Sequence, residues 1–101
     1  MSTKASYKAK SVETQSGTYL RVEVPSLRQR DIVAKFPEGK HEGYYDPEKG
    51  YDDFEVSFVD TETSNSFNVY ARYGQVRIGA FGTVSDDEVE DFYNWLVGQF
   101  S

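Results

Sequence analysis

Cysteine is absent from this chain, and histidine occurs once, at His41. Without cysteine there is no disulfide, no thiolate zinc site and no cysteine nucleophile. A lone histidine leaves a serine nucleophile with a single candidate base, and it gives an imidazole metal site no second ligand. The glycines open no phosphate-binding loop. These absences predict a protein that is not an enzyme and that uses no cofactor and no metal.

A long hydrophobic run is also missing. The chain has no stretch of about 18 apolar residues, so we expect no membrane-spanning helix. Residues 1–13 are polar and lack the apolar centre of a secretory signal. Small secreted domains often depend on disulfides, so the missing cysteines favour a cytoplasmic location.

Aromatic residues and charge are what the chain does contain. Its 101 residues fit one domain, residues 1–101, and the 16% that are aromatic must supply much of the core. The net charge of −6 is divided unevenly, because residues 1–40 hold eight Lys or Arg against four Asp or Glu, and residues 41–101 hold three against thirteen. Either these charges mix on the folded surface, or they leave an acidic face that repels or imitates nucleic acid.

Alternating apolar residues predict the strands. The expected strands cover residues 7–13, 18–24, 53–59, 66–73 and 76–82. In the second of them, Leu20, Val22 and Val24 are expected to face the core. Gly17, just before that strand, favours a hairpin with the first one. The short connections between the last three strands predict an antiparallel meander.

A C-terminal helix is predicted by its start and by its period. Ser85 is a candidate N-cap with Glu88 three residues on, the pattern of a capping box, and the acidic residues here suit the positive end of the helix dipole. An apolar stripe follows, made of Val89, Phe92, Tyr93, Leu96 and Phe100.

A second helix is predicted over residues 27–35, opened by Ser26 with Gln29 three residues on; a strand over residues 32–36 is the alternative. The fold class is therefore α+β, a single antiparallel sheet of four to five strands in the order ββαβββα. The C-terminal amphipathic helix is expected to pack on one face of this sheet.

The longest connection, residues 39–52, combines tyrosine with acidic residues. A calcium loop beginning at Asp46 would need glycine where Tyr51 stands, so we predict no metal site. Tyrosine is enriched at protein interfaces, although these tyrosines could also cover the sheet edge. The predicted partner-binding residues are Tyr44, Tyr45, Asp46, Glu48, Tyr51, Asp52 and Asp53.

The outward sheet face predicts an alternative binding surface. Its residues are Tyr19, Arg21, Tyr70, Arg72, Arg77 and Phe81. Aromatic residues interleaved with arginine are typical of single-stranded nucleic-acid binders. Glu23, Glu55 and the acidic second half oppose phosphate binding, and Tyr–Arg pairs that only stabilise the sheet are the other interpretation.

These observations lead to one hypothesis of function. We expect a small acidic protein-binding or inhibitory module, of the kind that phages or mobile elements direct against a host protein. The alternative is a single-stranded nucleic-acid-binding domain that uses the sheet face. The expected partner is a protein and not a membrane, and the chain is expected to be a monomer or a homodimer.

Overall fold

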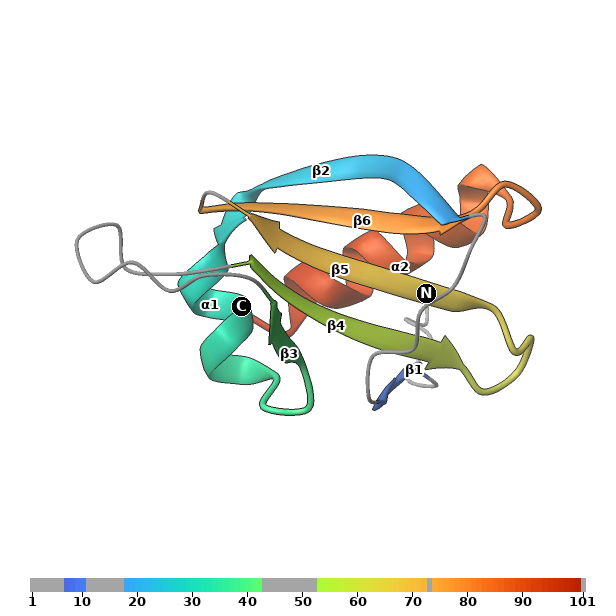
Figure 1. Ribbon diagram of the computed structural model, residues 1–101. Helices are drawn as coiled ribbons and strands as arrows, with labels where there is room; N and C mark the ends of the chain where they lie inside the picture. The colour runs from blue at the N-terminus through green and yellow to red at the C-terminus, as the bar shows by residue number, and fades with distance from the viewer. Residues whose placement is uncertain (1–6, 11–17, 43–52, 73, 101) are drawn as a thin grey trace.

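The computed structural model describes residues 7–10, 18–42, 53–72 and 74–100. Within them, six strands form one antiparallel sheet and two helices accompany it, which confirms the α+β class (Figure 1). The elements are β1 (Tyr7–Lys10), β2 (Thr18–Arg28), α1 (Gln29–Lys35), β3 (Lys40–Glu42), β4 (Asp53–Asp60), β5 (Ser66–Arg72), β6 (Gln75–Phe81) and α2 (Asp86–Gly98). The predicted order is correct except for the added strand β3. Neither of these helices is long and apolar enough to cross a membrane.

The strands lie in the spatial order β1-β4-β5-β6-β2, and β3 pairs with β4 beside this path. The predicted meander of β4, β5 and β6 is confirmed by a continuous register, in which Val69 lies opposite Val56 on one side and Ile78 on the other. The predicted hairpin of the first two strands is wrong. β1 pairs with β4 and β2 pairs with β6, so they occupy opposite edges of the sheet.

One aromatic side chain explains the position of β1. Tyr7 is buried, and its ring makes edge contacts with Phe67 and Phe92. The ring centroids lie 5.8 Å and 5.1 Å apart, respectively. A strand paired with β4 places Tyr7 in this aromatic cluster, where the centroid of the Trp95 ring also lies 5.2 Å from that of Tyr7. The free energy gained by burying an aromatic ring in a cluster exceeds the modest loop-closure entropy that a local hairpin would save.

Helix α2 lies across one face of the sheet (Figure 1). Ser85 is its N-cap, as predicted, and the Ser85 hydroxyl accepts a hydrogen bond from the Glu88 N–H at 3.2 Å. The Phe92 ring stacks on Phe67 with the ring centroids 4.5 Å apart. The buried positions of α2 are Val89, Phe92 and Leu96. The apolar stripe therefore faces the core, as its period predicts.

Helix α1 confirms the weaker helix prediction in type but not in its start. The strand alternative is wrong, and α1 begins at Gln29 because β2 continues through Arg28. The Asp31 carboxylate accepts a hydrogen bond from the Arg28 N–H at 2.9 Å, so the first turn is capped here and not at Ser26. Gln29 joins α1 to the β5–β6 turn, because its N–H donates to the Gly74 carbonyl at 3.2 Å and its side-chain oxygen accepts from the Gly74 N–H at 3.1 Å. Gly74 has a φ of 80°, which glycine adopts without strain.

Candidate functional site

The tyrosine-rich connection lies almost wholly outside the described residues. Asp53 is the exception: it is the first residue of β4, half-buried and opposite Glu42 in the register. The predicted residues beyond the described ranges are Tyr44, Tyr45, Asp46, Glu48, Tyr51 and Asp52. The connection is also shorter than expected, because Lys40–Glu42 forms β3. These three residues show no apolar alternation, so periodicity could not reveal the strand.

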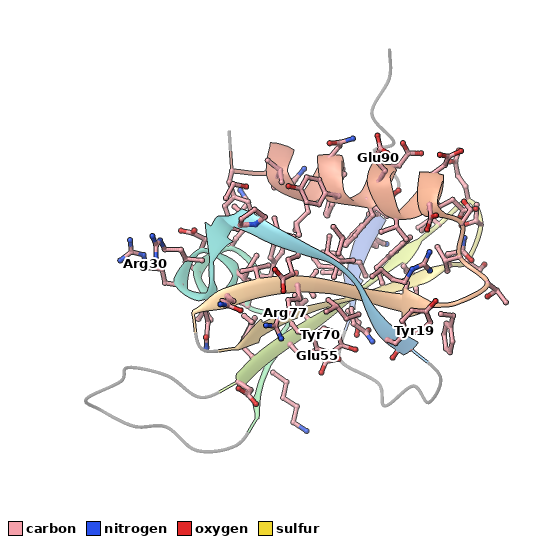
Figure 2. All side chains as sticks on the ribbon, turned by 90° about the horizontal axis from the view of Figure 1, so that it is seen from above. Tyr19, Arg30, Glu55, Tyr70, Arg77 and Glu90 are labelled. Carbon is pink, nitrogen blue, oxygen red and sulfur yellow. The ribbon has the colours of Figure 1, made fainter. Side chains whose placement is uncertain are left out.

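A row of polar side chains crosses the sheet face away from α2. Directly opposed residues on neighbouring strands share a face. The register therefore places Glu55, Tyr70, Arg77 and Glu23 in one row across β4, β5, β6 and β2. Figure 2 shows the labelled members Glu55, Tyr70 and Arg77 on the side opposite α2. Of the predicted sheet-face residues, Tyr70 and Arg77 are brought together here, whereas the Arg72 side chain is not among those described.

Arg77 is held by its neighbours in the sheet. Its Nη2 donates to Gln75 Oε1 at 2.8 Å, and its Nε lies 3.6 Å from Glu23 Oε1. That Nε is buried, and no described atom accepts a hydrogen bond from it. Because this row contains two carboxylates, Glu23 and Glu55, and one guanidinium, it has no surplus positive charge to attract a phosphate backbone.

Tyr70 covers a buried polar network next to this row. Asn68 is buried, accepts a hydrogen bond from the Ser57 hydroxyl at 3.0 Å and donates to the Tyr70 hydroxyl at 3.2 Å. The Tyr70 ring also lies over Gly79, where an added Cβ would stand 2.5 Å from a ring carbon. Tyr70 is thus part of the fold as well as a predicted contact residue.

The predicted outward orientation of Arg21 is wrong. The ladder between β2 and β6 shifts at this residue, since Leu20 lies opposite Gly79 and Val22 opposite the next residue, Ile78. One extra residue in a strand exchanges the two faces. Leu20, expected to be in the core, is therefore on the open face and 47% exposed, whereas Arg21 turns toward α2.

Arg21 secures the connection between β6 and α2. Its guanidinium donates to the carbonyl oxygens of Phe81 at 2.9 Å and Val84 at 2.8 Å, and to Asp86 Oδ1 at 2.8 Å. Phe81 is half-buried. Tyr19 is 55% exposed, and the Arg21 guanidinium lies 5.6 Å from its ring centroid. With three oxygen acceptors inside the molecule, Arg21 stabilises the fold and is not placed to bind phosphate.

Helix α2 carries the main charged surface of the described residues. It contains five Asp or Glu residues and no Lys, Arg or His. Four of them are exposed and are here called the acidic face: Asp86, Asp87, Glu90 and Asp91. Glu88 is half-buried, and its carboxylate accepts a hydrogen bond from the Asn65 side chain. Capping and the helix dipole were enough to explain the carboxylates of the first turn from the sequence. The overlooked signal was that Glu90 and Asp91 continue the run beyond the first turn.

Most of the exposed basic residues are kept apart from the acidic face after folding. Arg28, Arg30, Lys35 and Lys40 lie in and around α1, and Lys8 lies on β1. Figure 2 shows Arg30 on α1, well away from Glu90 on α2. Of the two alternatives that the sequence left open, the described part of the chain therefore has an acidic face and not an evenly mixed surface.

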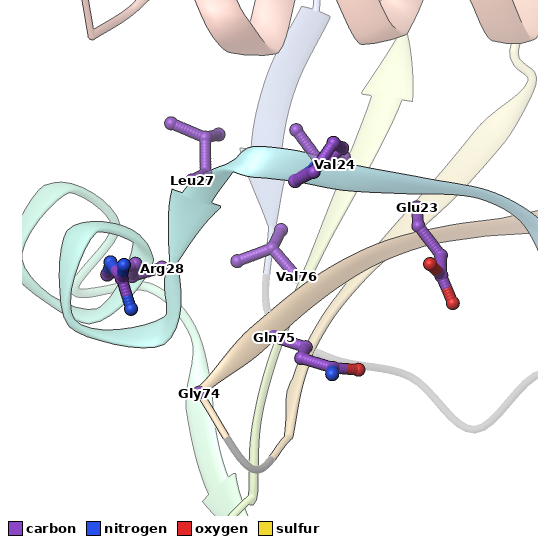
Figure 3. Close-up of a pocket in the computed structure, with 8 residues that line it drawn as sticks. Glu23, Val24, Leu27, Arg28, Gly74, Gln75 and Val76 are labelled. Atoms are coloured by element: carbon purple, nitrogen blue, oxygen red, sulfur yellow. The ribbon is translucent and has the colours of Figure 1, made fainter.

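A pocket of about 250 Å³ lies where β2 separates from β6 (Figure 3). Register is lost between the pair Glu23–Arg77 and the pair Arg28–Gln75. Pro25 stands in this stretch and has no N–H for the ladder, which explains the separation. Three of the apolar side chains that line the pocket belong to the core: Val24, Leu27 and Val76. We assign this pocket no binding role.

A groove of about 350 Å³ runs between β2 and α2, next to the acidic face. We call it the β2–α2 groove. It is lined by Arg21, Val22, Asp86, Val89, Glu90 and Tyr93. Strand and helix lie side by side here (Figure 2), and the groove combines apolar walls with a charged rim.

Neither the grouping of metal-ligating side chains in the described residues nor a comparison with known proteins assigns a function. In the described ranges, no three His, Asp or Glu side chains are grouped as a metal ion would require. No protein-family model, curated protein or solved structure matches the chain. The acidic face and the groove beside it are therefore the features that can indicate a function.

Proposed function

We propose that this protein is a non-enzymatic binding module that engages a basic region of a partner protein through the acidic face of α2. The observation that carries the proposal is the charge of that helix, with five carboxylates and no basic residue among thirteen residues. Complementary charge steers the encounter of two proteins and selects among partners. Inhibition of a host protein, by a phage or mobile-element product, is the action that we expect of such a module.

The fold alone does not account for this concentration of charge. Carboxylates in the first turn interact favourably with the helix dipole, but Glu90 and Asp91 lie beyond that turn. Like charges four residues apart repel each other on a helix, and Asp86 with Glu90 and Asp87 with Asp91 are such pairs. A basic partner surface would relieve this repulsion, so the arrangement favours binding.

The nucleic-acid alternative has less support on the described sheet face. Arg21 is bound to carbonyl oxygens and Asp86, and Arg77 is flanked by Glu23 and bound by Gln75. A single-stranded oligonucleotide is the direct probe. Binding that is lost in Arg77→Gln and falls steeply with salt would favour this alternative over ours.

The loop prediction remains a proposal from sequence. Tyr44, Tyr45 and Tyr51 would add an aromatic contact to the same partner, and rim carboxylates would mainly alter the association rate. Replacement of the three tyrosines with alanine, singly and together, tests this contact in any assay in which the acidic face is shown to bind a partner.

Two double variants with the same charge change test the acidic face. Glu90→Gln with Asp91→Asn neutralises α2, and Glu23→Gln with Glu38→Gln neutralises exposed carboxylates elsewhere. Wild type and variants are immobilised, and the proteins that each retains from the native cell extract are identified. The affinity for each retained protein is then measured at rising ionic strength. We expect the α2 variant to bind about tenfold or more weakly, with a reduced salt dependence, because Coulomb attraction is screened by salt. Equal retention by both variants would show that the acidic face is not the binding surface.

A further inference from the structure

The β2–α2 groove has the chemistry of a side-chain receptor. Val22 and Tyr93 are half-buried and Val89 is buried, so they form apolar walls. Asp86 and Glu90 are exposed at the rim, four residues apart on α2. Apolar walls with a few placed polar groups are the usual construction of a binding cleft.

The charge at the rim is negative. Arg21 is also in the groove, but its guanidinium is 10% exposed and donates to Phe81 O, Val84 O and Asp86 Oδ1. Asp86 remains 100% exposed despite this contact, so its carboxylate is accessible to a second cation. Glu90 adds a further negative charge on the same side.

The strand that borders the groove is an edge of the sheet. No described strand pairs with β2 on the side away from β6. The large hydrophobic residues that the structure exposes, Tyr19 at 55% and Leu20 at 47%, both lie near the start of this edge. Extended peptides bind to proteins along such edges, with side chains entering adjacent clefts.

We propose that the β2–α2 groove binds an extended, basic-apolar segment of the partner protein, which lies along β2. An apolar side chain of that segment contacts Val22, Val89 and Tyr93. A lysine or arginine two residues along the segment, which points to the same face, pairs with Glu90 and Asp86. This inference rests on the proposed function, because it supplies the recognition element of the partner that the acidic face attracts.

A second copy of this chain is a poorer occupant. Antiparallel pairing of two β2 edges would bring two acidic rims together, each with Asp86 and Glu90. Like charges across an interface cost free energy.

Three synthetic peptides of equal length test the occupant. In the lysine–valine peptide, lysine and valine take turns at every second position with serine between them, so both point to one face of the extended segment. The lysine–serine peptide has serine in place of valine, and the glutamate–valine peptide has glutamate in place of lysine. Binding is followed by backbone amide shifts of the ¹⁵N-labelled full chain. We expect the lysine–valine peptide to shift Val22, Val89 and Tyr93 and to bind about tenfold tighter than lysine–serine. The glutamate–valine peptide should not bind.

Two charge reversals on α2 locate the site. Glu90→Lys lies in the groove, whereas Asp91→Lys makes the same change one residue away and outside its lining. We expect Glu90→Lys to weaken lysine–valine binding by about tenfold more than Asp91→Lys. Circular dichroism and a monodisperse sedimentation profile confirm that each variant folds.

The results separate this inference from the proposed function. Equal binding of both lysine peptides, with equal effects of the two reversals, would overturn the groove while leaving the acidic face as a cation-binding surface. Failure of all three peptides, with capture of basic proteins intact, would also overturn it. Dimerisation that shifts the groove amides with rising protein concentration would replace the peptide with a second copy.

Discussion

Tyr7 illustrates how a single residue joins the core to the charge of this protein. Its ring is buried among Phe67, Phe92 and Trp95. Burial, and to a smaller extent the negative charges of nearby carboxylates, raises the pKa of its phenol to about 12. These carboxylates, in decreasing order of effect, are Asp60, Asp91, Glu88 and Glu62.

We therefore predict that Tyr7 makes the folded protein sensitive to alkali. The unfolded chain loses the phenol proton near pH 10, whereas the folded chain keeps it to about pH 12. The stability from this group is thus complete below about pH 10 and is lost as the pH rises toward about 12. The free energy of unfolding, measured in denaturant, should decline less steeply over this range in Tyr7→Phe than in wild type. Parallel declines would mean that Tyr7 titrates normally.

At the scale of elements, α2 is specified by signals that agree with one another. Ser85 caps it, and the buried residues Val89, Phe92 and Leu96 recur with the helical period. β2 is the opposite case, because its alternation breaks at Arg21 and its pairing is lost around Pro25. The groove and the pocket both adjoin this irregular strand.

A pair of serine variants compares the two helix starts. Ser85→Ala removes the acceptor for the Glu88 N–H and should lower the free energy of unfolding by about 0.5–2 kcal/mol. Ser26→Ala is the control, because Ser26 is exposed in β2 and is not the cap of α1. Its effect should stay within about 0.5 kcal/mol in the same denaturation experiment. A larger effect at Ser26 than at Ser85 would contradict both assignments.

For the whole molecule, the placement of the two N-terminal strands determines the strand order of the sheet. β1 and β2 lie at opposite edges, with the meander between them. Charge is also divided, since most of the exposed basic residues lie around α1 and the acidic face lies on α2. A partner that approaches α2 therefore meets negative charge beside an edge of the sheet on which no other described strand pairs with β2.

Engineered disulfides can test this topology because the chain has no cysteine of its own. Lys8 lies opposite Val59 in the register, so Lys8→Cys with Val59→Cys should oxidise to a bridge within one chain. A local hairpin would instead place Lys8 near Glu23, and Lys8→Cys with Glu23→Cys is the control. Mass spectrometry after oxidation should find the bridge in the first variant and free thiols or intermolecular dimers in the second. The reverse result would restore the hairpin.

Much of the fold could be predicted because its signals are local. The cap at Ser85 and the apolar stripe that follows it both lie within one short segment of the chain, so they predict α2 without reference to the rest of the sequence. The short connections of the meander allow only antiparallel neighbours, so β4, β5 and β6 could also be predicted. The candidate site was predicted less well, because Tyr70 and Arg77 do lie together but Arg21 does not join them.

By itself, then, the sequence determined the α+β class, the helix α2, the meander and the concentration of acid in the second half. Only the tertiary structure decided which edges β1 and β2 occupy, because a strand chooses its partner by what its side chains can bury across the whole chain. It also decided that Arg21 faces α2, since a bulge is a mismatch between two strands and not a property of one. The β2–α2 groove depends on both, because Val22 and Glu90 meet only when the edge strand and the last helix are in place.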